Sequence, residues 1–160
     1  MNPSERSTLI ESFGNAHAVL VASLQAFPLE MWRFKPSPDR WSVHEMIVHI
    51  ADSEANSYVR CRRLVAEPGS TVMAYDENRW ATALDYHSQS TEEALELFKW
   101  LRARTYTLVK SLPDSVWSNT VYHTEYGTMT MDDWLRLYER HIPEHVAQMH
   151  ANHEAWLLIQ

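Results

Sequence analysis

Glycine, cysteine and long apolar runs are scarce in this 160-residue chain, and each scarcity excludes a class of protein. Three glycines suit a helical protein and exclude a glycine-rich phosphate-binding loop. The single cysteine, Cys61, cannot form an intrachain disulfide, which favours a reducing cytoplasm. No apolar stretch approaches the roughly 20 residues that a membrane span needs, so we expect no membrane association.

Basic residues are also in deficit, with 14 lysines and arginines against 21 acidic residues and a formal net charge of −7. A protein that binds nucleic acid gathers a basic patch against the phosphates, so we expect no nucleic-acid partner. The only dense basic run, Arg60, Arg62 and Arg63, is better explained as a solvated helix face. The segment from Met1 to Glu11 is polar, unlike a secretory signal peptide, which again favours the cytoplasm.

What the chain does contain is helical periodicity. Its length and its 45% hydrophobic content predict one domain over residues 1–160. Apolar spacing and capping residues predict an all-α four-helix bundle with long connections. The expected long helices run from Ser4 to about Phe27, from a capping box at Ser42 to about Val65, from a second capping box at Ser90 to about Leu112, and from Thr130 to Trp156.

The connections carry weaker signals. A short helix is expected around Asn78 to Leu84, and residues 116–129 have some strand propensity with Gly127 as a turn residue. In the third long helix the residues expected to face the core are Leu95, Phe98, Leu101, Leu108 and Leu112. In the second, Glu54 falls near the centre of the apolar stripe. A lone carboxylate there must either pair with a buried cation or support a functional site.

The most informative segment is the last helix, where two histidines lie in the stripe that should face the core. At about 100° per residue the stripe contains Trp134, Leu137, Tyr138, His141, His145, Gln148, Met149, Asn152 and Trp156. Burying imidazole is costly unless its nitrogens find partners, and one metal ion would satisfy both rings. The other explanation is two core histidines hydrogen-bonded to polar groups such as Gln148 and Asn152. Pro143 between the two rings is unusual inside a helix.

Two familiar metal motifs are excluded. His44 and His49 flank a segment similar to the HExxH zinc-protease motif, but they are five residues apart and point about 140° away from each other. Carboxylate-bridged di-iron bundles need Glu-x-x-His pairs, and the chain has none.

A third ligand must therefore come from another helix. His49 is the best candidate and His17 the second. Three neutral imidazoles around one divalent ion leave a coordination position for water or substrate, as in catalytic sites. Zinc, nickel or ferrous iron would accept such ligands, with manganese also possible, and the spacing does not choose among them.

Several segments together resemble a known family. The run from Trp41 to Glu54 is similar to the second-helix signature of the DinB-like superfamily, and more closely to its YfiT-like branch. The segments Tyr75–Trp80, His123–Gly127 and Arg140–His145, Pro143 included, also resemble that branch. The branch is described as metal-dependent hydrolases and includes bacillithiol S-transferases.

The resemblance implies a four-helix bundle, frequently a homodimer, with one metal bound by His49, His141 and His145. It implies a metal-dependent hydrolase or a thiol S-transferase that acts on small molecules, and a low-molecular-weight thiol is a possible cosubstrate. Asp52 or Glu54 would orient the ligands. The alternative is a non-catalytic bundle, either a metal-stabilised dimer or a small-ligand-binding protein. Neither the general acid or base nor the roles of His123 and Arg60 follow from the sequence.

Overall fold

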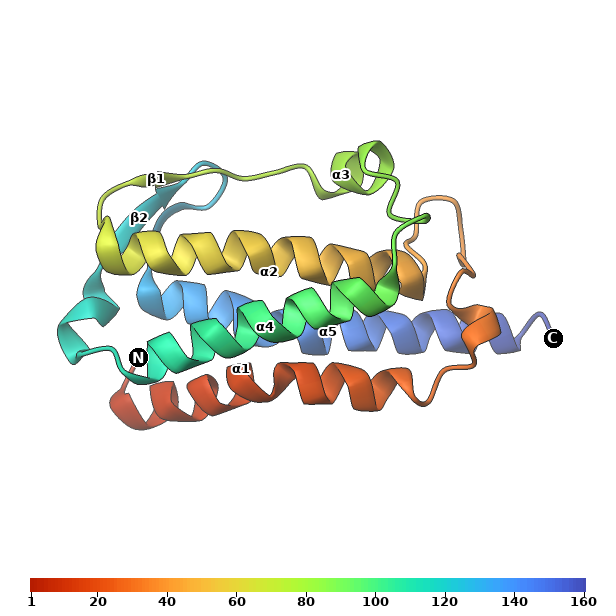
Figure 1. The fold of residues 1–160 in the computed structure, drawn as a ribbon, viewed down its shortest axis with the longest axis horizontal. Coiled ribbons are helices and arrows are strands. Elements are labelled where there is room, and N and C mark those ends of the chain that lie inside the picture. The colour runs from red at the N-terminus through yellow and green to blue at the C-terminus, as the bar shows by residue number, and fades with distance from the viewer.

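Four long helices pack side by side and form the body of the molecule (Figure 1). The computed structural model describes residues 1–160. The long helices are α1 (Pro3–Leu24), α2 (Val43–Ala66), α4 (Thr91–Lys110) and α5 (Met131–Leu157). The predicted four-helix bundle is confirmed, and the largest difference in helix ends is at α1, which ends at Leu24 instead of Phe27.

Short elements fill the connections between the long helices. They are the 3-10 helices η1 (Leu29–Met31) and η2 (Asp114–Ser118), the helix α3 (Glu77–Ala83), and the strands β1 (Thr71–Val72), β2 (Thr120–His123) and β3 (Gly127–Thr130). Figure 1 shows α3 beside the N-terminal half of α2 and the strands beside its C-terminal end. None of the helices is both long and apolar enough to cross a membrane.

The small sheet is the one departure from an all-α chain. β2 and β3 pair antiparallel, with Val121 opposite Met129, and β1 pairs parallel to β2, with Val72 opposite His123. Gly127 begins β3 with a φ of 75°, a left-handed conformation that glycine adopts without steric cost. The predicted turn residue is therefore confirmed, and the weak strand propensity of this segment produces a real hairpin.

Helix starts follow the predicted capping chemistry, with one difference. In α2 the Ser42 hydroxyl accepts from the Glu45 amide at 3.2 Å, and the Glu45 carboxylate accepts from the Ser42 amide at 2.8 Å. Thr130 and Asp133 form the same reciprocal pair at the start of α5. Ser90 makes only half of the box, because it accepts from the Glu93 amide but the Glu93 side chain makes no return bond.

The predicted core face of α4 is confirmed in part. Phe98 is buried, and Leu95, Leu108 and Leu112 are half-buried and pack against the hydrophobic core, while Leu101 is half-buried outside it. The other buried residues of α4 are Ala94, Arg102, Thr105 and Val109. The apolar pattern did not locate the centre of the face, because the residue there is charged. Arg102 is 1% exposed and points into the middle of the bundle.

Arg102 joins all four long helices. Its guanidinium makes a bidentate ion pair with Glu54 of α2, at 3.0 Å from Nε and 2.7 Å from Nη2. It also donates to the backbone carbonyls of Phe13 in α1 and Tyr138 in α5, at 3.1 and 3.3 Å. Burial raises the pKa of Glu54, and the guanidinium opposes that rise. Of the two sequence-based explanations for Glu54, the buried cation partner is the one observed.

We predict that Arg102→Leu lowers the free energy of unfolding by about 3–5 kcal/mol, because it leaves the Glu54 carboxylate buried without a partner. The double variant Arg102→Leu with Glu54→Leu should recover most of that loss. The measurement is urea unfolding followed by circular dichroism. Lys99→Met, which removes an exposed ion pair with Glu96, is the control and should change the free energy by less than about 1 kcal/mol. Equal losses for Arg102→Leu and Lys99→Met would contradict the central role of the pair.

Candidate metal centre

Three histidines from two helices converge inside the bundle. His49 of α2 and His141 and His145 of α5 each offer one ring nitrogen, and these nitrogens lie within 4.8 Å of one another. The ring centroids are 5.5 Å apart for His49 and His141, 5.0 Å for His49 and His145, and 4.6 Å for His141 and His145. His49 and His145 are 1% and 8% exposed, and His141 is half-buried. The predicted set is therefore assembled in space.

Helix geometry explains this convergence. Residues four apart on a helix lie one above the other on the same face, so His141 and His145 point the same way from α5. The indole N–H of Trp134 donates to the Ser57 carbonyl of α2 at 3.3 Å and fixes one helix against the other. Helix α5 is unbroken through Pro143, whose side chain is exposed on the opposite side from the cluster. The proline therefore does not disturb the packing of the core. Its role in orienting the two histidines stays a prediction.

The hydrogen bonds of the cluster leave lone pairs on ring nitrogens free to bind a cation. Nδ1 of His145 is 3.1 Å from Oε1 of Gln148, and because an amide oxygen only accepts, Nδ1 carries the proton. Nε2 of His145 is therefore unprotonated, and it faces Nε2 of His141 at 3.1 Å. The Ser53 hydroxyl lies 3.5 Å from that same His141 nitrogen.

Burial keeps the three rings uncharged. Desolvation, followed by the neighbouring His145, lowers the pKa of His49 to about 3. Desolvation lowers the pKa of His145 to about 4, with Gln148 opposing, and it holds the pKa of His141 well below its usual range. At neutral pH all three rings are thus neutral imidazoles, the form that binds metal.

The spacing of the His141 and His145 nitrogens fits one metal ion, and the His49 nitrogen lies within 4.8 Å of both. Zinc–nitrogen bonds of about 2.0–2.1 Å in a tetrahedral site place two nitrogens about 3.3–3.4 Å apart, close to the observed 3.1 Å between the His141 and His145 atoms. The Nδ1 atom of His49 is buried without a hydrogen-bond partner. Burial of an imidazole nitrogen without a hydrogen-bond partner is costly unless another group, such as a metal ion, binds the ring. The residues present therefore fit a mononuclear three-histidine site.

A hollow leads to the cluster from the protein surface. It has a volume of 380 Å³ and is lined by Asp39, Arg40, Trp41, Met46, Glu77, Asn78, His145 and Gln148. The Trp41 ring packs on His49, with 4.6 Å between centroids, and its carbonyl accepts from Asn152 of α5 at 2.8 Å. His145 is thus reachable from outside although it is nearly buried.

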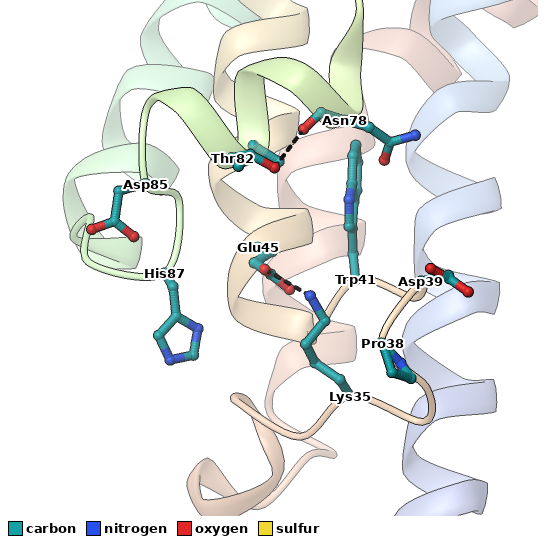
Figure 2. A pocket seen from close by; sticks show the side chains of 10 residues that line it. Lys35, Pro38, Asp39, Trp41, Glu45, Asn78, Thr82, Asp85 and His87 are labelled. Atoms are coloured by element: carbon teal, nitrogen blue, oxygen red, sulfur yellow. Dashed lines mark hydrogen bonds and ion pairs between the residues drawn. The ribbon is translucent and has the colours of Figure 1, made fainter.

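A second hollow of 580 Å³ adjoins the first, and the two share Asp39, Trp41 and Asn78. Figure 2 shows the Trp41 ring reaching toward Asn78, with the ion pair of Lys35 and Glu45 beside it. Trp41 therefore borders both hollows as well as the histidine cluster.

The other sequence-derived candidates lie elsewhere. Asp52 accepts a hydrogen bond from the Tyr86 hydroxyl, and Glu54 pairs with Arg102, so neither is hydrogen-bonded to the three histidines. His17 packs half-buried against Phe98, 5.8 Å between ring centroids, outside the cluster.

The hydrogen-bond partners of the cluster are instead Gln148 and Ser53. Gln148 stands three residues after His145, and this helical spacing predicts their contact. Ser53 stands four residues after His49 but contacts His141 on the other helix, so no spacing in the sequence predicts that contact. Gln148 is one of the two partners expected for histidines without a metal ion. The second partner suggested there, Asn152, holds the Trp41 carbonyl instead.

Comparisons with known proteins identify the family of the chain. A family model described as the DinB superfamily matches residues 13–149. A protein of Oceanobacillus iheyensis named "Putative metal-dependent hydrolase" is 30% identical over 109 residues, and YfiT of Bacillus subtilis, which carries the same descriptive name, is 29% identical over 110 residues. Each alignment covers 68% of this chain, but only 63% and 62% of these relatives' own lengths.

Solved structures show the same fold. YfiT from Bacillus subtilis, described as having an unusual four-helix bundle topology, superposes with a TM-score of 0.87 at 23% identity, over 95% of this chain and 87% of that one. A mycothiol-dependent maleylpyruvate isomerase superposes with a TM-score of 0.71 at 15% identity, over 93% of this chain and 61% of that one.

The segment matched by the family model includes all three clustered histidines and the hollow beside them. The chain therefore belongs to the DinB superfamily, and its named relatives are of the YfiT type.

Proposed function

We propose that this chain is a divalent-metal-dependent enzyme that acts on small molecules, either a hydrolase or a thiol S-transferase. One observation carries the proposal: three neutral imidazoles converge at the end of a hollow that opens to the surface. The relatives named as metal-dependent hydrolases support it. A site that served only to hold the helices together would not need this access.

The proposed ligands are His49, His141 and His145, with zinc or nickel as the preferred ion and iron or manganese as the other candidates. An ion held by these three imidazoles would keep a coordination position for a water or a thiol, toward which it would supply Lewis-acid chemistry. The thiol form of the proposal is supported by the fold shared with a mycothiol-dependent isomerase. Dimerisation and a cytoplasmic location stay predictions.

The surrounding residues prepare the site for that role. Gln148 fixes the tautomer and orientation of the His145 ring through Nδ1. Trp41 covers one side of His49 and limits the access of water to it. The hollow itself is lined by charged and amide side chains, including Asp39, Arg40 and Asn78, and it therefore suits a polar small molecule.

We expect protein purified without an affinity tag to contain about one divalent ion per chain, measured by elemental analysis. His141→Ala should lose that ion, because two imidazoles are left. His150→Ala, which removes an exposed histidine from the same helix, should retain it. Equal trace metal in the wild type and in His141→Ala would contradict the proposal that the three histidines bind a metal ion.

Gln148→Leu should weaken metal affinity by about 10- to 100-fold, because His145 loses the group that orients it. Competition with a chelator of known affinity measures the change. Glu144→Gln, an exposed substitution on α5 between the two ligands, is the matched control and should leave the affinity unchanged. An unchanged affinity in Gln148→Leu would remove Gln148 from the site.

A turnover panel should separate the enzyme from a non-catalytic bundle. Cellular thiols with electrophiles, and hydrolysable esters and amides, are assayed with added zinc, nickel or manganese. We expect turnover in at least one arm, and its loss in His49→Ala while circular dichroism shows an intact fold. If His49→Ala loses thermal stability or metal but wild-type protein turns over nothing in any arm, the non-catalytic alternative is the correct one.

A further inference from the structure

Arg60 is a buried cation without a counter-ion. It lies on α2 and is 7% exposed. Its guanidinium donates to the Tyr138 hydroxyl and to the Met73 carbonyl, both at 2.6 Å, and both acceptors are neutral. No carboxylate forms an ion pair with it, in contrast to Arg102, which holds Glu54 in a bidentate pair. Because a buried charge without a partner is costly, the absence of a counter-ion needs an explanation.

Two further polar atoms nearby are buried without partners. Nδ1 of His123 accepts from the amides of Glu125 and Tyr126, at 3.2 and 3.3 Å, so in the neutral ring the proton lies on Nε2. That Nε2 atom has no acceptor, although His123 is only 1% exposed. The hydroxyl of Tyr75 is likewise buried without a hydrogen bond of good geometry, and the polar group that acts on it most is Ser53. Buried polar groups in native proteins are nearly always satisfied, so such atoms point to a missing partner.

The sheet brings these groups to one place. Val72 of β1 pairs in register with His123 of β2, and the next residue, Met73, supplies the carbonyl that holds Arg60. Tyr75 follows two residues later on the same connection. Burial first, and then the charge of Arg60, lowers the pKa of His123. Burial raises the pKa of Tyr75, and Ser53, followed by a smaller effect of Arg60, opposes that rise. The guanidinium thus acts on both side chains.

The same groups lie next to the histidine cluster. Tyr138, which binds Arg60, stands one turn before His141 on α5, with 6.3 Å between their ring centroids. On α2, Ser53 stands between His49 and Arg60 in the sequence and contacts His141. The Tyr126 ring stacks on His123 at 4.6 Å and is itself 59% exposed, so the cluster lies directly beneath the surface.

We propose that Arg60, His123 and Tyr75 bind a carboxylate group of the small-molecule substrate beside the metal centre. The proposal rests on the proposed function and names the substrate class for that site. The single positive charge of Arg60 matches the single negative charge of a carboxylate. The two neutral donors, on His123 and Tyr75, match its two oxygens. The exposed carboxylates of Glu77 and Glu125 act on Arg60 and His123 and weaken the binding of every anion, most of all one that carries two charges on a single group, such as doubly charged phosphate.

The test is anion binding to metal-free protein, in which no ion can hold the ligand. Sodium acetate, sodium succinate and sodium phosphate are titrated at constant ionic strength set by chloride. Binding is followed by the ¹⁵N signals of the Arg60 side chain and of His123 Nε2. We expect saturable binding of acetate and succinate, with dissociation constants on the order of millimolar for such small ligands, and none of phosphate.

Three variants and one control locate the binding. Tyr75→Phe removes only the hydroxyl, and His123→Asn keeps an acceptor for the two backbone amides while it removes the Nε2 donor. Each should weaken acetate binding about three- to tenfold, the effect of one lost neutral hydrogen bond, at an unchanged melting temperature. Arg60→Met should abolish saturable binding. Arg104→Gln removes an exposed charge on α4 and should have no effect.

Several outcomes would overturn the proposal. If wild-type protein shows no saturable acetate binding, or if Tyr75→Phe and His123→Asn bind as well as the wild type, Arg60 is only a brace between α2, α5 and the sheet. Binding of phosphate without binding of acetate would refute the carboxylate assignment. His141→Ala should still bind acetate. A failure of the carboxylate proposal and a failure of the proposed metal site can therefore be told apart.

Discussion

The bidentate ion pair between Arg102 and Glu54 is the interaction on which the rest of the structure depends. Through one guanidinium it connects α4 to α2, and through two backbone carbonyls it reaches α1 and α5. The carbonyl on α5 belongs to Tyr138, one turn before His141, and Glu54 stands five residues after His49 on α2. Together with the hydrogen bond from Trp134 to the Ser57 carbonyl, the pair holds α2 and α5 against each other. The convergence of the three imidazoles depends on that relation.

Much of the fold and of the histidine cluster could be predicted from the sequence, because the responsible signals are local. Capping residues such as Ser42 and Thr130 locate helix starts, and the spacing of His141 and His145 places both rings on one face. The third ligand, His49, needed the family resemblance as well, since spacing within one helix says nothing about its partner helix. What the structure adds to this set is its hydrogen bonds, to Gln148 and Ser53.

The features that could not be predicted depend on contacts between distant segments. The buried face of α4 is centred on Arg102, and an apolar pattern cannot place a face around a charge whose partner lies on another helix. Strand β1 has only two residues and pairs with β2 across a long stretch of chain. Asp52 turns to Tyr86, a residue of the connection before α4, and not to a ligand. In each case the decisive partner has no fixed spacing in the sequence.

The division of the histidine cluster between α2 and α5 also has a consequence for when the site can exist. His49 is synthesised long before His141 and His145, with α4 and the whole sheet in between. A nascent chain that ends after α4 contains His49 but lacks His141 and His145, the two other histidines of the cluster. During synthesis the cluster cannot form before α5 has been made. An ion that needs all three rings could therefore bind only after the last helix is present.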